Sequence, residues 1–130
     1  MKSQAKLAVA VVSAFALGGA VVEGLHAQAK AKPAVYAVTE IDVKNMDAYM
    51  KEYAPKAQAL IKKSGGRLVA ASSSPSTIEG KAPAPRVAIQ IWKDMDQYKA
   101  YRNSAELKDV RAIGNKYASF RTFAVEALPQ

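Results

Sequence analysis

Segments in which apolar side chains recur at every second position predict the strands of this chain. The clearest are residues 35–43 (VYAVTEIDV) and 86–92 (RVAIQIW), each with one mainly aliphatic face. This alternation is typical of a strand that packs one face on a core. Residues 67–72 and 119–127 have a similar character, and residues 77–79 are a candidate extension of the second strand. The pattern therefore predicts a sheet of four strands.

The first helix is predicted between the first two strands, from about residue 46 to residue 64. Its apolar positions follow the i, i+3, i+4, i+7 spacing of one helix face. Asn45 or Asp47 can cap the start, because a short polar side chain accepts hydrogen bonds from the first free amide groups. Gly65 and Gly66 follow the last apolar position and end the helix.

Both helical segments contain an expected interruption. Pro55 lacks an amide hydrogen and its ring clashes with the preceding turn, so we expect a kink or a restart near Ala54. The second segment begins after the capping residue Asp94. It is expected to break just before Ser104, which can cap a further helix that runs to about Tyr117.

The predicted order of elements is strand, helix, strand, strand, helix, strand. Right-handed crossovers place both helices on one face of an antiparallel sheet, so we expect an α+β domain of the ferredoxin-like βαββαβ class. The aliphatic faces of the first and third strands suit the helix side. We therefore expect the uncovered side to carry a mixed set of side chains: Tyr36, Glu40, Gln90 and Trp92. An open face with large aromatic groups is expected to meet a partner or a ligand.

The N-terminal segment has the three parts of a secretory signal in the right order. Lys2 and Lys6 precede an apolar run at residues 7–22, and small residues at Ala27 and Ala29 offer cleavage sites. The run is shorter than the roughly 20 residues that span a bilayer, so an uncleaved anchor is the less favoured alternative. We expect an exported protein, periplasmic or secreted, that keeps no membrane span after cleavage.

This interpretation divides the chain into four parts. They are a signal peptide at 1–29, a linker at 30–34, one domain at 35–127 and a short tail at 128–130.

Composition limits the chemistry that the exported chain can perform. The 130 residues include no Cys and one His, which is His26 and belongs to the signal. The processed chain would then lack a Cys nucleophile, a Ser-His-Asp triad, disulfides, Cys/His zinc sites and His- or Cys-ligated haem. Asp94 and Asp96 are interpreted as a helix cap and a first-turn acid rather than metal ligands. We expect neither a cofactor nor a metal.

The chain is basic, with 19 Lys and Arg against 11 Asp and Glu and a net charge of +8. Cleavage of the signal lowers this charge by one. The remaining lysines are scattered among acidic residues at helix-surface spacing and form no stripe with aromatic side chains. We interpret them as a solvated surface and expect no nucleic-acid partner.

The residues expected on the uncovered face suggest a site. Glu40 and Tyr36 are four apart on one strand and point the same way, so an enclosed Glu40 with a raised pKa could act as general base beside a Tyr36 donor. Arginines would bind an anionic substrate. The candidate ligand-binding residues are Tyr36, Glu40, Arg67, Arg86, Gln90, Trp92 and Arg121. We favour a simpler interpretation, in which Glu40 forms an interfacial ion pair with one of the arginines and fixes the register of a dimer.

Several motifs resemble those of the family called domain of unknown function 1330, which belongs to the dimeric α/β-barrel superfamily. In chain order, the most specific are Gly65-Gly66-Arg67, Glu79-Gly80 and Asn103-Ser104. Single positions that fit are Tyr36, Glu40, Tyr49, Tyr53, Pro55, Arg86 and Arg121, whereas Trp92, Tyr101 and Phe120 depart from the usual pattern. The resemblance covers about residues 34–127.

The resemblance implies a homodimer whose two sheets face each other around an internal cavity. Relatives in the superfamily include cofactor-free monooxygenases, lactone isomerases and haem-dependent enzymes, while the family itself has no agreed reaction. We therefore expect a protein that binds a small organic molecule, anionic if the arginines contact it, in the dimer cavity. The alternatives are a cofactor-free isomerase or monooxygenase that uses Glu40 and Tyr36, and a structural or stress-associated dimer without a ligand.

Overall fold

The computed structural model describes residues 31–130. The signal peptide and the cleavage sites predicted at residues 1–29 lie outside this range. Within the described range, no helix is both long and apolar enough to cross a membrane.

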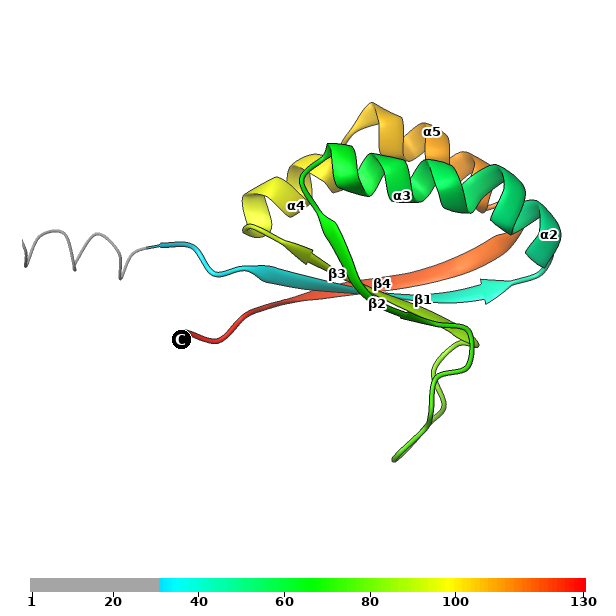
Figure 1. The fold of residues 1–130 in the computed structure, drawn as a ribbon, viewed down its shortest axis with the longest axis horizontal. Coiled ribbons are helices and arrows are strands. Elements are labelled where there is room, and N and C mark those ends of the chain that lie inside the picture. Colours follow the sequence, from blue (N-terminus) through cyan, green and yellow to red (C-terminus); the bar gives the residue numbers. More distant parts are fainter. Residues whose placement is uncertain (1–30) are drawn as a thin grey trace, which may run out of the picture. The chain divides into compact units, whose positions relative to one another are not determined.

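The described chain forms an antiparallel four-stranded sheet with the strand order β2-β3-β1-β4. The helices lie over this sheet in Figure 1. The central strand β1 (Val35–Val43) pairs with β3 (Arg86–Trp92) and with β4 (Ala118–Glu126), while β2 (Arg67–Ser72) pairs with β3 at the edge. The four predicted strands and the ferredoxin-like α+β class are confirmed.

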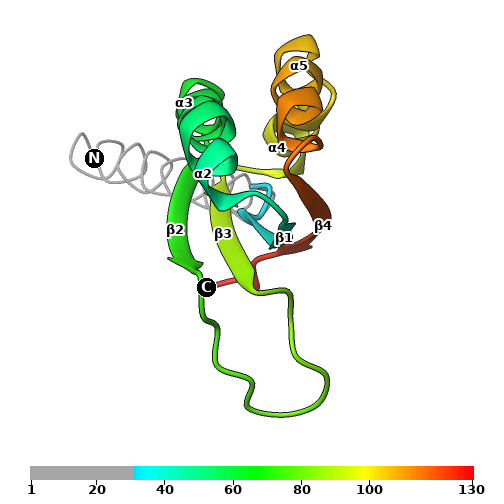
Figure 2. The same cartoon turned by 90° about the vertical axis from the view of Figure 1, so that its right-hand side faces the viewer.

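The predicted extension of the second strand at residues 77–79 is wrong. These residues belong to a loop, 73–85, that leaves the sheet and projects away from the helices (Figure 2). Pro75, Pro83 and Pro85 cannot donate to a strand ladder, which explains why the pairing stops. Ile78 in this loop is 91% exposed.

The first helical segment contains a widened turn where the sequence predicted an interruption. It consists of α2 (Met46–Ala48), a π-helical stretch η1 (Tyr49–Tyr53) and α3 (Ala54–Lys63). The amide of Ala54 donates to the carbonyl of Tyr49, one residue further back than in an α-helix. The wider turn precedes Pro55 in the first turn of α3, so the expected restart near Ala54 is confirmed.

The second segment divides into α4 (Met95–Arg102) and α5 (Ala105–Gly114). Asp94 accepts the amide hydrogen of Gln97 at 2.8 Å, and Ser104 Oγ accepts that of Leu107 at 3.1 Å. Both predicted caps are confirmed, and each satisfies an amide that the helix leaves free. Helices α2, α3, α4 and α5 lie on the same face of the sheet (Figure 2).

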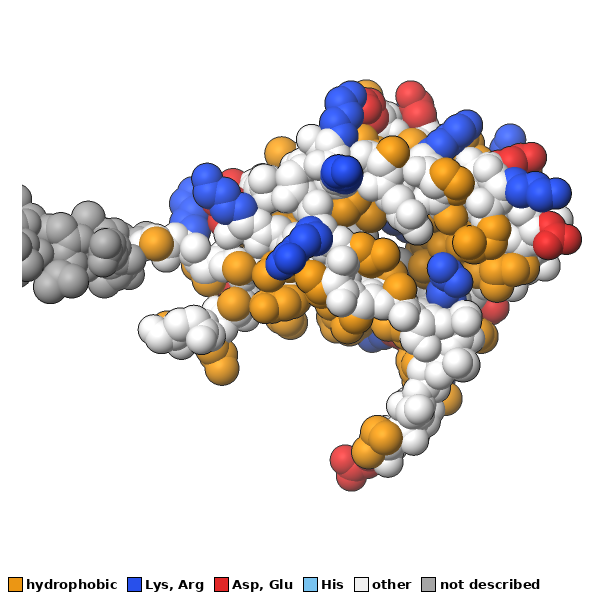
Figure 3. Space-filling view, in the orientation of Figure 1, with side chains coloured by type: hydrophobic (Ala, Val, Ile, Leu, Met, Phe, Trp, Pro, Cys, Tyr) orange, Lys and Arg blue, Asp and Glu red, His pale blue; other side chains and the backbone are white. Residues whose placement is uncertain are grey.

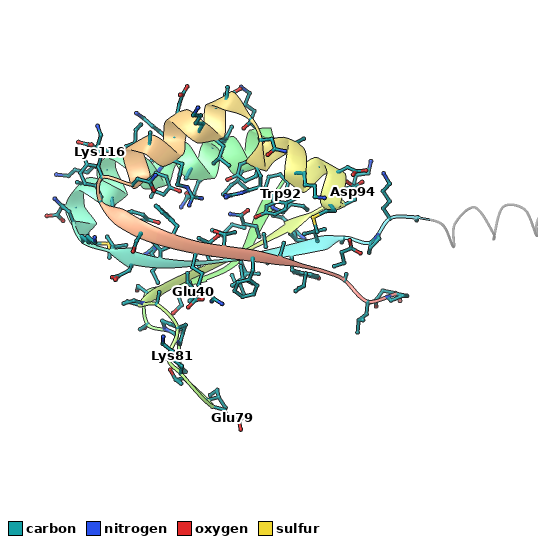
Figure 4. The ribbon with its side chains drawn as sticks, turned by 180° about the vertical axis from the view of Figure 1, so that it is seen from behind. Glu40, Glu79, Lys81, Trp92, Asp94 and Lys116 are labelled. Atoms are coloured by element: carbon teal, nitrogen blue, oxygen red, sulfur yellow. The ribbon has the colours of Figure 1, made fainter. Side chains whose placement is uncertain are left out.

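The pairing of β1 with β3 reverses the predicted orientation of β3. Trp92 lies opposite Val35 and Gln90 lies opposite Ala37, so these residues share the side of the sheet that the helices cover. Trp92 is 1% exposed and Gln90 is 8% exposed. The expectation that Gln90 and Trp92 lie on the uncovered side is therefore wrong. Figure 4 shows Trp92 on the helix side and Glu40 on the opposite side.

The reversal leaves an apolar uncovered side, which we call the open face. Antiparallel register places the aliphatic residues of β3 beside the even-numbered residues of β1. The large side chains of the open face are Tyr36, Val38, Glu40, Val87, Ile89, Ile91, Arg121, Phe123 and Val125. Phe123 is 44% exposed and Val125 is 54% exposed, so this face is more exposed to solvent than the side that the helices cover.

Aromatic packing against the sheet accounts for much of the core. The Trp92 ring stacks on Tyr101, with centroids 4.5 Å apart, and lies 5.6 Å from the Tyr98 ring. Its indole nitrogen donates to the Gln90 side-chain oxygen at 3.0 Å, so the one polar atom of the indole is satisfied. Gly66 lets the chain pass directly over this ring, because a Cβ there would lie 2.5 Å from a Trp92 ring carbon.

We predict that Gly66→Ala lowers the free energy of unfolding by about 1–3 kcal/mol, because the new methyl group forces the Trp92 ring to move. Urea unfolding followed by tryptophan fluorescence measures the change. Gly80→Asn is the control: Gly80 has a φ of 76°, which asparagine tolerates, and a Cβ there meets nothing within 4 Å. Equal stability of the two variants would contradict the close contact at Gly66.

Candidate functional site

A cavity of about 60 Å³ lies between the sheet and the helices, and we call it the inner cavity. Figure 3 shows a hollow in the surface beneath α3, with hydrophobic side chains around it. The polar residues that line the cavity are Thr39, Tyr49, Tyr53, Gln58, Arg86, Gln90, Tyr101 and Arg111. The remaining lining residues are aliphatic, and no Asp or Glu is among them.

The π-helical stretch η1 supplies two of the tyrosines. Tyr49 and Tyr53 stand four residues apart at its ends, and both are buried. Their ring centroids lie 5.2 Å apart. Burial raises the pKa of Tyr53 to about 12, against the charge of Arg111, which lowers it. Burial likewise raises the pKa of Tyr49, which the nearby Arg86 guanidinium opposes. These phenols therefore stay protonated at neutral pH and can donate hydrogen bonds.

Two arginines give the inner cavity its positive charge. The Arg86 guanidinium carbon lies 5.6 Å from the centroid of the Tyr49 ring. The Arg111 guanidinium carbon lies 4.0 Å from the centroid of the Phe120 ring. Among the described residues, Arg111 Nε is buried without a hydrogen-bond partner. A buried donor left unsatisfied lowers the stability of the fold by about 1–3 kcal/mol, and by more when the donor is charged. A hydrogen-bond acceptor placed at this atom would remove that cost.

A second hollow lies on the open face under the loop 73–85, and we call it the loop groove. It encloses about 630 Å³ and is lined by Val38, Glu40, Pro75, Lys81, Ala82, Pro83, Val87, Arg121 and Phe123. Glu40 accepts the Ala84 amide hydrogen at 3.0 Å and forms an ion pair with Arg121. The carboxylate thus ties the base of the loop to two strands.

The general-base hypothesis needs a raised Glu40 pKa, and the structure contradicts this part of it. The hydrogen bond from the Ala84 amide, followed by the hydrogen bond and charge of Arg121, lowers the pKa of this carboxyl group below its ordinary value of 4.5. A carboxylate held in its charged form is a weak base. The contacts of Glu40 match the alternative in which it forms a structural ion pair, here within one protomer.

The sequence-predicted site residues divide between the two sides of the sheet. Arg86 and Gln90 line the inner cavity, and Trp92 packs beside them in the core. Tyr36, Glu40 and Arg121 lie on the open face, and Arg67 lines a groove between α3 and the edge strand β2. The structure therefore does not bring Glu40 and Tyr36 together with Gln90 and Trp92.

Several residues of the inner cavity were not predicted as site residues. They are Thr39, Tyr49, Tyr53, Gln58, Tyr101 and Arg111. Arg111 follows Leu107 by four positions and adjoins Val110, both of which pack in the core. The position of this arginine on the apolar face of a helix therefore indicates a partly buried cation. Within residues 31–130, no group of His, Cys, Asp and Glu could hold a metal ion.

Comparison with known proteins gives a family and a fold. The family described as "Domain of unknown function (DUF1330)" matches residues 34–128. The search of curated proteins found no match.

Solved structures share the architecture at low sequence identity. A protein of unknown function from Rhodopseudomonas palustris aligns with a TM-score of 0.62 and 11% identity, over 82% of this chain and 94% of that one. SnoaB, a cofactor-independent oxygenase from Streptomyces nogalater, aligns with a TM-score of 0.56 and 14% identity, over 75% and 96% of the two chains. A conserved protein of unknown function from Bacteroides thetaiotaomicron gives 0.52 and 17%, over 75% and 100%. At these identities the likeness shows the common fold.

We predict that the free energy of unfolding falls as the pH rises from 10 towards 12. Because the pKa of Tyr53 is about 12 in the folded protein and 10.0 is its ordinary value, the folded state holds the proton more tightly. This stabilisation is complete below pH 10 and is lost as the pH passes 12. For Tyr53 it amounts to roughly 2–3 kcal/mol.

Urea unfolding at pH 9 and pH 11 measures the change. Tyr53→Phe should reduce the pH dependence, whereas Tyr36→Phe, on the open face, should retain it. An unchanged dependence in Tyr53→Phe would contradict the raised pKa of Tyr53.

Proposed function

The chain belongs to the family described as domain of unknown function DUF1330, and on that premise we propose that it binds a small organic anion in the inner cavity. The observation that carries this proposal is the buried, unpartnered Nε of Arg111 in a cavity whose lining contains no carboxylate. A buried guanidinium nitrogen without a hydrogen-bond acceptor is costly. A bound anion would remove that cost.

The chemistry of the lining selects the type of anion. A guanidinium presents its N–H groups in a planar fork that fits a carboxylate. Arg86 provides a second guanidinium, and the protonated hydroxyl groups of Tyr49 and Tyr53 are further donors. We therefore favour a carboxylate, or another oxyanion whose charge is shared between oxygens.

The volume limits how much of the ligand is enclosed. A water molecule takes about 30 Å³ of liquid, so 60 Å³ corresponds to roughly two water molecules. A carboxylate group with one or two carbon atoms fits this space. A larger ligand would keep its anionic head inside and extend the rest towards the surface.

A cofactor-free oxygenase is the second candidate function. The observation that favours it is the fold shared with SnoaB, which is described as a cofactor-independent oxygenase. Guanidinium and phenol donors that bind an anion would also stabilise an anionic intermediate. In this alternative the acting residues would be those of the inner cavity, because Glu40 lies on the other side of the sheet.

We also propose that the protein is a homodimer that buries the open face. An apolar sheet face that is partly exposed to solvent is typical of a surface that binds another protein. A second copy of the chain would supply a matching apolar face, and the projecting loop 73–85 would lie beside it. No partner residue is needed for the inner cavity, so ligand binding and dimerisation are separate properties in this proposal.

We predict that Arg111→Met weakens binding of a small carboxylate at least tenfold, because a charged hydrogen bond is worth about 1.5–3 kcal/mol. A ¹⁹F NMR titration with trifluoroacetate measures the affinity. Arg86→Met should weaken binding to a similar extent. Lys116→Met removes an equal charge from an exposed turn and should bind as the unmodified protein does.

The thermal stability of ligand-free Arg111→Met provides an independent measurement. It should stay level or rise, because the substitution removes a buried Nε donor that has no acceptor. Unchanged carboxylate affinity in Arg111→Met would overturn the proposed site.

We predict that Phe123→Lys converts the dimer to a monomer, because the substitution would bury a charged group in an apolar interface. Phe123 is 44% exposed in the protomer, so the substitution should leave its fold intact. Sedimentation velocity measures the mass, with Ala59→Lys on the exposed side of α3 as the control. A Phe123→Lys dimer, or a monomeric unmodified protein, would refute the proposed interface.

A further inference from the structure

We infer that the anion enters the inner cavity through a basic groove at the junction of α4 and α5, and that Arg111 passes it from groove to cavity. The inference rests on the proposed function and adds a route and a residue role to it. The groove, which we call the α4–α5 groove, encloses about 490 Å³.

Arg111 connects the two spaces. Its side chain lines the inner cavity, and it also lines the α4–α5 groove. It is the residue common to both linings. An anion bound to the guanidinium on the groove side is thus already in contact with a group that faces the cavity.

The electrostatics of the groove favour capture of an anion. Arg102 and Lys108 line it together with Arg111, and its lining contains no Asp or Glu. Both Arg102 and Lys108 are exposed, one on each side of the break between the helices. Cations gathered in a groove raise the local concentration of anions and speed their association.

The contacts of Arg111 allow its guanidinium to change position. Its Nε has no hydrogen bond to break within the described residues, and the ring of Phe120 lies against the guanidinium at 4.0 Å. Cation–π contact constrains direction less than a set of hydrogen bonds does. The guanidinium can therefore turn between the groove and the cavity while it stays on the Phe120 ring.

A competing entrance exists between α3 and β2. A groove there shares Gln58, Ile61 and Leu68 with the inner cavity and carries Lys62 and Arg67 further out. Two of the three shared residues are aliphatic. An anion on this route would pass Ile61 and Leu68, whereas on the α4–α5 route it would meet Arg111, which lines both spaces.

The test compares two charge reversals, Lys108→Glu at the α4–α5 groove and Lys62→Glu at the competing entrance. Both lysines are exposed, and both substitutions change the net charge equally. The full chain is titrated with trifluoroacetate at low ionic strength, and ¹⁹F relaxation dispersion gives the association rate. Circular dichroism confirms that each variant is folded.

We expect Lys108→Glu to slow association about three- to tenfold, with the difference closing at high salt, because screening weakens exposed charges. Arg102→Glu should act in the same way, and Lys62→Glu should stay within twofold of the unmodified protein. Equal effects of Lys108→Glu and Lys62→Glu, or a larger effect of Lys62→Glu, would overturn the α4–α5 entrance while leaving the binding proposal intact. Absence of binding to the unmodified protein would overturn the proposed function itself.

Discussion

The antiparallel pairing of β1 with β3 determines which side chains lie on each side of the sheet. With Val35 opposite Trp92, the polar and aromatic residues of β3 face the helices and its aliphatic residues face away. A shift of one residue would exchange these two sets completely. Arg86 and Gln90 then would not line a cavity, and the open face would lose its aliphatic surface. The two proposed properties, ligand binding inside and dimerisation outside, both depend on this one register.

The positions of the elements could be predicted from the sequence, because they depend on local physics. Capping side chains at Asp94 and Ser104, the stop at Gly65 and Gly66, and the restart near Pro55 each act within a few residues. The orientation of β3 could not be predicted in the same way. Alternation shows that a strand has two different faces, and an aliphatic face suits a dimer interface as well as a core. Trp92 needed a large enclosed volume, which the helix layer supplies.

The candidate site was only partly predictable for a similar reason. Arg86 and Gln90 were expected to contact a ligand, and they do line the inner cavity, although from the side opposite to the one expected. Arg111 becomes part of the same cavity only when α5 packs over the sheet. Glu40, by contrast, does not line the inner cavity. The sequence made it a candidate general base, but Arg121 and the Ala84 amide hold it in its charged form. The sheet thus separates two environments. The inner cavity contains arginines and no carboxylate, whereas on the open face Glu40 and Arg121 form an ion pair.

The π-helical stretch η1 has a geometric consequence for the helix that contains it. A π turn amounts to one extra residue in an α-helical frame, and each residue of an α-helix turns the chain by about 100°. η1 therefore works as a phase shift between α2 and α3, and Tyr49 at its first position lines the same cavity as the apolar face of α3. If the same residues formed a regular α-helix without the widened turn, α2 would be rotated by about 100° relative to α3. The widened turn makes the tyrosine lining of the cavity compatible with the buried face of the helix.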